Sequence, residues 1–200
     1  MKLFLHCCCA PCSVMCVEEL QKQDFDLTLF WYNPNIHPLV EYKNRLDTFI
    51  EYAQKNKLKT CIKYKYYIKK FFCCLTNNIF KYNILENICL NLNNIWEFPN
   101  RCFLCYHMRL ECTAKYARLN NFDAFSSTLL ISPYQSHEII YEIAMYYASK
   151  YDIEFIYKDF RSYFKEGQKK SRVMGFYMQK YCGCIFSEAE SNKKCAKLLK

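Results

Sequence analysis

The sequence predicts an α/β domain in which a mostly parallel sheet is flanked by helices. Short runs of β-forming residues alternate with segments of helical periodicity, and parallel strands joined through helices are the usual result of that order. Hydrophobic residues make up 52% of the 200 positions, so a core of ordinary size is available. No linker or internal repeat divides the chain, and residues 1–200 are expected to form a single domain.

The first third of the chain supplies three predicted strands and two predicted helices. A short apolar strand over 2–5 runs into a cluster of cysteines, and Pro11 suits the first turn of the helix that follows over 14–23. Residues 25–32 are rich in β-forming types and are bounded by Asn33 and Pro34, which predicts a second strand. The remaining elements of this part are a helix over 39–56 and a strand near 59–64.

The segment 65–100 has no clean period and is expected to be a variable insertion, either irregular or helical. Regular patterns return after it, and this is where we expect the rest of the sheet and its covering helices. They predict, in order, a helix over 104–119, a strand over 122–131, a helix over 137–150, a strand over 153–160 and a basic helix over 163–175.

Polar and thiol-rich motifs follow the predicted strands. They fall at 6–9, 33–37, 132–134 and 159–161. In a Rossmann-like parallel sheet, ligands bind outside the carboxyl ends of the strands. The sequence therefore predicts a cysteine-rich metal site at that rim.

The cysteine content narrows the chemistry further. There are fifteen cysteines, an odd number, and the N-terminus lacks the long apolar centre of a secretory signal. No apolar run approaches the roughly 18 residues that span a bilayer. We therefore expect a cytoplasmic protein without a membrane partner, in which clustered thiols serve metal or redox chemistry.

Two separated cysteine pairs are the strongest metal-site candidates. Cys8 and Cys9 lie at the predicted strand-to-helix turn, and Cys102 and Cys105 form a C-x-x-C at the start of a helix, where the helix N-terminus favours thiolates. Four thiolates from two such pairs are the usual requirement of a [4Fe–4S] cluster. Zinc would accept the same four ligands in a closed structural site.

Two further thiol motifs allow redox chemistry without a metal. Cys182 and Cys184 flank Gly183, and such a Cys-Gly-Cys can close a strained, easily reduced disulfide or supply a further metal ligand. Cys9 and Cys12 form a C-x-P-C that resembles a thioredoxin-like motif. A thiol–disulfide oxidoreductase is therefore one alternative function.

The net charge of +9 favours an anionic partner such as a nucleic acid. His6 and His37 are candidates for proton donation or for structural roles in loops, since imidazole titrates near neutrality. Asp159 and Arg161 suit the binding of substrate hydroxyls or a phosphate, or a plain ion pair. A basic segment near the C-terminus is the candidate RNA-backbone surface, unless it is a solvated helix face, and consists of Lys165, Lys169, Lys170, Arg172 and Lys180.

Six motifs occur in an order that resembles a known family. They are HCCCAPC at 6–12, YNPNIHP at 32–38, RCFLC at 101–105, STLLISPY at 127–134, DFR at 159–161 and QKYCGC at 179–184. Together they closely resemble the cobalamin-independent epoxyqueuosine reductases over residues 1 to about 188. The resemblance fails over roughly 62–100, and Cys7 replaces what is usually an apolar residue.

The resemblance implies reduction of the epoxide of epoxyqueuosine to the alkene of queuosine, at the wobble position of a tRNA anticodon. It implies a catalytic domain whose [4Fe–4S] ligands are Cys8, Cys9, Cys102 and Cys105. The redox pair would be Cys182 and Cys184, and Cys12 would be a candidate ligand of an additional mononuclear iron. The implied partners are tRNA and an electron donor that the sequence does not identify. A zinc-stabilised RNA-binding module remains the other alternative, and the metal content of purified protein separates the two.

Overall fold

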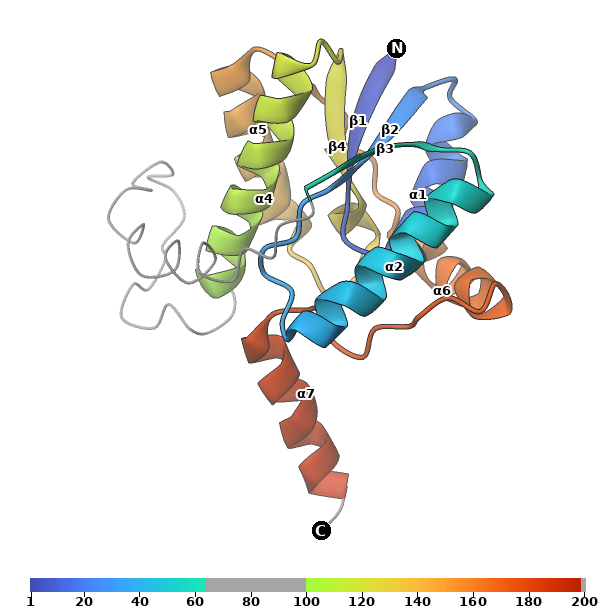
Figure 1. The fold of residues 1–200 in the computed structure, drawn as a ribbon. Helices are drawn as coiled ribbons and strands as arrows, with labels where there is room; N and C mark the ends of the chain where they lie inside the picture. The colour runs from blue at the N-terminus through green and yellow to red at the C-terminus, as the bar shows by residue number, and fades with distance from the viewer. Residues whose placement is uncertain (64–99, 199–200) are drawn as a thin grey trace.

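The computed structural model describes residues 1–63 and 100–198, and its centre is a sheet of five parallel strands (Figure 1). The strand order is β3-β2-β1-β4-β5. This confirms the predicted α/β class with its parallel sheet. The strands are β1 (Lys2–Cys7), β2 (Asp26–Trp31), β3 (Lys59–Ile62), β4 (Ala124–Ser127) and β5 (Glu154–Phe155).

Helices cover both faces of this sheet. Figure 1 shows α4 and α5 on one face and α1, α2 and α6 on the other, while α7 projects away from the sheet. None of the described helices is long and apolar enough to cross a membrane. The helices are α1 (Ala10–Gln21), α2 (Leu39–Lys55), α4 (Asn100–Leu119), α5 (His137–Tyr151), α6 (Phe164–Val173) and α7 (Ile185–Leu198).

The core is built on β1, which lies between two neighbouring strands and is buried after its first residue. Phe4 of β1 stacks on Phe30 of β2 with ring centroids 4.7 Å apart. On the outer layer, α6 packs directly on α1. A Cβ at Gly167 would lie 3.2 Å from Met15 Cγ and 3.3 Å from the Pro11 carbonyl oxygen, so a side chain there would push the two helices apart by a few tenths of an ångström.

Two predicted strands differ from the observed elements, and one observed helix has no predicted counterpart. The strand predicted over 122–131 ends at Ser127, because the Ser127 hydroxyl accepts from the Leu129 amide at 3.2 Å and caps a 3₁₀ turn, η2 (Thr128–Ile131). The strand predicted over 153–160 shrinks to the two residues of β5, and Phe160 bonds instead to the Leu130 carbonyl at 3.1 Å. Helix α7 was not predicted.

The predicted insertion at about 65–100 lies almost entirely outside the described residues, which resume at Asn100. The prediction that the chain forms one domain therefore stays a prediction.

The strand order reverses at β1, because β2 lies on one side of it and β4 on the other. Such a reversal opens a crevice outside the carboxyl ends of the two strands, where ligands of open α/β sheets bind. The last residue of β1 is Cys7, and the Cys8 amide that follows donates to Thr128 Oγ1 at 3.2 Å, just beyond the end of β4. The first cysteine cluster therefore lies at the topological switch point.

Candidate functional site

Three cysteine sulfurs meet where β1 passes into α1. The sulfurs of Cys8, Cys9 and Cys12 all lie within 4.8 Å of one another, and those of Cys8 and Cys9 are 3.8 Å apart. Cys9 is the N-cap of α1, with an extended backbone (φ −173°), and its carbonyl accepts from Ser13 Oγ at 2.8 Å. This position places the sulfurs at a helix N-terminus, which favours thiolates over thiols.

Electrostatics within this cluster favour one thiolate. Hydrogen bonds from the thiols of Cys12 and Cys9, with help from the Arg109 guanidinium and the Thr128 hydroxyl, hold the pKa of Cys8 well below its usual range. Burial raises the pKa of Cys9, and the bond to Cys8 raises that of Cys12. These interactions favour a thiolate at Cys8, and a bound metal ion would displace the protons of the other two thiols.

The spacing of these sulfurs fits a metal. Two sulfurs bound to one tetrahedral ion at about 2.3 Å lie about 3.8 Å apart, which is the separation of Cys8 and Cys9. Within residues 1–63 and 100–198, this is the one group of three or more cysteine, histidine or acidic side chains with such spacing. Cys7 is buried outside the group, and its thiol donates to the Leu5 carbonyl at 3.4 Å.

The second cysteine pair begins α4. Cys102 and Cys105 lie in the first two turns of this helix and do not join the three-sulfur group. Arg109 lies one turn later, and its Nη1 is 3.8 Å from Cys105 Sγ. Burial raises the pKa of Cys105 to about 12 against the opposing charge of Arg109, which also acts on Cys8. Arg109 therefore contacts Cys105 of this pair and acts electrostatically on Cys8 of the three-sulfur group.

The third set, Cys182 and Cys184, lies on the loop before α7. Both are free thiols; the Cys182 side chain is exposed and that of Cys184 is buried. Buried Arg45 holds this loop, because Nη1 donates to the Cys182 carbonyl at 3.0 Å and Nη2 to the Tyr181 carbonyl at 2.9 Å. The fork geometry of a guanidinium suits two neighbouring carbonyls.

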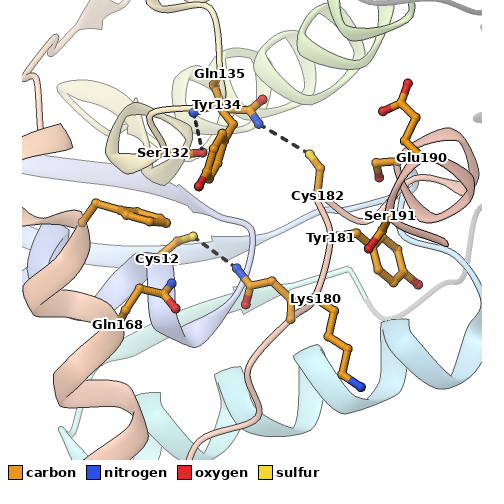
Figure 2. A pocket seen from close by; sticks show the side chains of 13 residues that line it. Cys12, Ser132, Tyr134, Gln135, Gln168, Lys180, Tyr181, Cys182, Glu190 and Ser191 are labelled. Atoms are coloured by element: carbon orange, nitrogen blue, oxygen red, sulfur yellow. Dashed lines mark hydrogen bonds between the residues drawn. The ribbon is translucent and has the colours of Figure 1, made fainter. Parts of the chain in front are cut away.

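Cysteines of different sets face one pocket of about 460 Å³. Figure 2 shows Cys12 and Cys182 facing it from different sides. Each thiol accepts from an amide: Gln179 Nε2 is 3.7 Å from Cys12 Sγ, and Gln135 Nε2 is 3.5 Å from Cys182 Sγ. The remaining lining is polar or aromatic and includes Ser132, Tyr134, Gln168, Lys180, Tyr181 and Glu190. The pocket thus combines thiol chemistry with groups that bind hydroxyls and stack on rings.

Comparison with known proteins identifies the family. A family model described as epoxyqueuosine reductase QueH matches residues 3–190. The chain belongs to the epoxyqueuosine reductase QueH family. Its relatives of that name include one from Dehalococcoides mccartyi, 32% identical over 94% of this chain and 93% of its own length. Others are from Acinetobacter baylyi (36% identical, 96% and 83%) and Thermotoga maritima (31% identical, 98% and 95%).

One solved structure shares the fold. A predicted subunit of a tRNA methyltransferase from Methanocaldococcus jannaschii superposes with a TM-score of 0.50 at 15% identity, over 83% of this chain and 75% of its own. At that identity the likeness concerns the fold alone. The family resemblance expected from the six sequence motifs is confirmed.

The other predicted site residues of this QueH-family chain do not line the pocket. His6 is fully buried: its Nε2 lies 3.2 Å from the Tyr32 carbonyl oxygen, and its Nδ1 lies 2.9 Å from Ser127 Oγ. Burial lowers the pKa of His6 to about 3, so its ring is neutral in this environment. His6 thus ties β1 to β4 and to the end of β2.

His37, Asp159 and Arg161 lie farther along the rim. The His37 backbone clamps the thiol loop, since its amide donates to the Gly183 carbonyl at 2.7 Å and its carbonyl accepts from the Tyr181 hydroxyl at 2.6 Å. Asp159 and Arg161 form a half-exposed ion pair at 2.5 Å. The Arg161 guanidinium lowers the pKa of Asp159 to about 2.

Sequence reasoning missed the two buried arginines and the two amides that contact the thiols. Arg109 follows Cys105 by four residues in a predicted helix, and that spacing alone places both on one helix face. Gln179 lies within the QKYCGC motif that the sequence analysis quoted. Arg45 and Gln135 reach the loop from remote elements, so no local pattern indicates them.

Proposed function

We propose that this chain reduces the epoxide of epoxyqueuosine in a tRNA anticodon to the alkene of queuosine. The observation that carries the proposal is the shared pocket, where Cys12 of the three-sulfur group and Cys182 of the loop face the same space (Figure 2). The names of the relatives support the same activity. A volume of about 460 Å³ is within the range of pockets that take small organic groups.

The substrate is proposed to enter as an unstacked nucleoside. Enzymes that act on a base take it out of the stack, and bases of single-stranded loops are read by aromatic stacking and by polar contacts at their edges. The pocket offers Tyr134, Phe164 and Tyr181 for stacking, and Ser132, Gln168 and Glu190 for hydroxyl or amine groups. An anticodon nucleoside therefore matches the lining in both size and chemistry.

We propose that Cys8, Cys9, Cys102 and Cys105 hold a [4Fe–4S] cluster. Support comes from Arg109, whose Nη1 lies 3.8 Å from Cys105 Sγ and whose charge also acts on Cys8. Each of the four cysteines would bind a separate iron, so the sulfurs of Cys8 and Cys9 would turn apart to hold the cluster. Cys12 is then left, at the pocket wall, as the candidate ligand of an additional mononuclear iron. When bound, such a cluster supplies electrons one at a time.

The dithiol of Cys182 and Cys184 is proposed to supply the electrons and protons that the reduction needs. Conversion of an epoxide to an alkene with loss of water takes two electrons and two protons. Oxidation of two thiols to one disulfide releases two electrons and two protons, so one dithiol matches one turnover. Gly183 between them has φ of +129°, which suits a tight Cys-Gly-Cys ring. An external electron donor then restores the dithiol.

The RNA backbone is proposed to lie along α6. The reaction is proposed to take place in the cytoplasm. Lys165, Lys169 and Arg172 are exposed at i, i+4 and i+7 of this helix, on one face, and form no ion pair in the described part of the chain. Gln168 of the same helix lines the pocket, as does Lys180. Lys170 is occupied by Glu18 at 2.6 Å. Replacing Lys165, Lys169 and Arg172 by Gln should weaken tRNA binding and lower its salt slope by about three.

Nucleoside analysis of tRNA tests the proposed function. A deletion strain should accumulate epoxyqueuosine, and the wild-type gene should restore queuosine, whereas Cys8→Ala should not. Cys16→Ala is the matched control, because Cys16 is buried in α1, the helix that follows Cys8, and lies outside the three-sulfur group. A queuosine level in the deletion strain equal to that of wild type would contradict the proposal.

Metal analysis of anaerobically purified protein tests the cofactor separately. About four to five irons per chain are expected. One zinc in place of iron, with queuosine levels independent of the gene, would instead indicate the zinc-stabilised RNA-binding module.

A further inference from the structure

Arg109 is a buried cation whose neighbours are a side-chain amide, an imidazole and a thiol. None of these groups carries a negative charge while the thiol is protonated. Its side chain is 2% exposed and ranks among the largest fully buried ones. Its Nη2 donates to Asn33 Oδ1 at 3.0 Å, its Nη1 lies 3.8 Å from Cys105 Sγ, and its Nε lies 3.4 Å from His6 Nε2. Among the residues that the structure describes, no carboxylate pairs with it.

A second buried arginine shows what is unusual about Arg109. Arg45 is equally buried, but its Nε donates to the Glu41 carboxylate at 2.6 Å. An ion taken out of water without a counter-charge costs several kcal/mol even after the protein relaxes. The Glu41 carboxylate offsets this desolvation free energy for Arg45. For Arg109, the anions available in the described part of the chain are the sulfurs of the two cysteine pairs, once they are thiolates.

We infer that Arg109 is a positioning residue whose fixed charge balances the anionic thiolate–metal centre, favours metal retention and raises the reduction potential of that centre. The inference rests on the proposed cluster at Cys8, Cys9, Cys102 and Cys105. A cluster with four thiolates carries net negative charge, and each added electron increases it. A cation beside Cys105 that also acts on Cys8 therefore stabilises the reduced form more than the oxidised form.

A purely structural role makes a different prediction. Arg109 also supports the chain after β2, because Asn33, its acceptor, donates through Nδ2 to the Cys7 carbonyl at 2.8 Å. Hydrogen bonding of this kind depends on donor geometry, whereas the electrostatic role depends on charge. Arg109→Lys keeps the charge and loses the fork, and Arg109→Gln keeps an amide donor and loses the charge.

The experiment is anaerobic redox titration of the iron-loaded protein, followed by electron paramagnetic resonance, with iron content measured beside it. In Arg109→Gln, the ratio of reduced to oxidised cluster at a fixed potential should fall at least tenfold, equal to about 59 mV for one electron. Arg109→Lys should stay within threefold of wild type. The control is Arg118→Gln, on the same helix but half-exposed and paired with Asp152 at 3.5 Å, and it should not shift.

Several results would overturn the inference. Arg109→Gln with the wild-type midpoint and iron content excludes the electrostatic role, and so does Arg109→Lys shifted as far as Arg109→Gln. If Arg109→Gln does not fold, Arg109→Lys decides alone: full iron content with a tenfold shift rejects the inference. Wild-type protein that binds no cluster would reject the proposed cofactor instead, so the two failures are distinguishable.

Discussion

The two cysteine sets that face the pocket are built in opposite ways. Cys8, Cys9 and Cys12 lie close together at the junction of a central strand and a helix N-terminus, with Cys9 and Cys12 buried and Cys8 half-buried. Cys182 and Cys184 lie on a loop, one exposed and one buried, and the loop is held through its backbone by Arg45. Rigid elements preserve the close spacing that a metal needs, whereas a loop allows two thiols to approach and separate. The difference suggests a division between holding a metal and cycling a disulfide.

The largest expected effect separates these two roles directly. Cys8→Ala should lose both iron and epoxide reduction, by more than the roughly 10–100-fold that removal of an outer partner of a ligand costs. Cys182→Ser should lose multiple-turnover reduction to a similar extent while it keeps the iron content of wild type. Iron analysis and product formation measured on the same preparations give the comparison.

Cys61→Ser provides the control for the loop variant, because Cys61 is a half-buried thiol on the edge strand β3. It should keep both iron and activity. If Cys182→Ser loses iron as completely as Cys8→Ala, then Cys182 is a metal ligand and the division of roles is wrong.

The contrast also explains how far sequence reasoning reached. The chain order of strands and helices, with the strand-ending motifs, was enough to predict a parallel sheet and to place the thiols at its rim. The grouping of Cys12 with Cys8 and Cys9 follows from their positions around one strand-to-helix turn. Local patterns carry this information because neighbours in the chain remain neighbours in space.

Contacts between residues far apart in the chain could not be predicted from local sequence patterns. Arg45 reaches the thiol loop across 137 positions, and Gln135 reaches Cys182 across 47. The short strand β5 was overestimated because Ile156, Tyr157 and Phe160 are β-forming types that pack irregularly here. Of these three residues only Phe160 is buried, and Tyr157 is exposed. Tertiary contacts therefore decide whether a ladder continues.

The second prediction concerns the anchor of the thiol loop, and α2 contains its own control. Glu41 and Arg45 form a buried i,i+4 pair at 2.6 Å, and Glu51 and Lys55 form an exposed one at 2.5 Å. Arg45→Met leaves the Glu41 carboxylate buried without its cation and should lower the free energy of unfolding by about 3–5 kcal/mol. Lys55→Met should lower it by about 0.3–0.5 kcal/mol. Urea denaturation of the two variants measures the difference.

The same pair of variants also reports on the loop. Arg45→Met removes both bonds to the loop carbonyls, so alkylation of Cys182 in native protein should accelerate, as followed by peptide mass spectrometry. Lys55→Met should leave that rate unchanged. Equal rates in both variants would show that the loop is held by contacts other than Arg45.

The smallest expected effect comes from two glycines with positive φ. Gly183 has φ of +129°, and an added Cβ would lie 3.1 Å from Arg45 Nη1 and 3.3 Å from Ile36 Cγ1. Gly175 has φ of +72° and open space around it. Gly183→Ala should cost about 1–3 kcal/mol of stability, because strain adds to the close contact, and Gly175→Ala about 1 kcal/mol.

Gly183→Ala should also slow disulfide formation between Cys182 and Cys184 without a change in iron content, since the loop alone is distorted. Equal stability losses and equal oxidation rates in the two variants would mean that the loop tolerates a side chain beside Arg45, and that its tight geometry is not what brings the two thiols together.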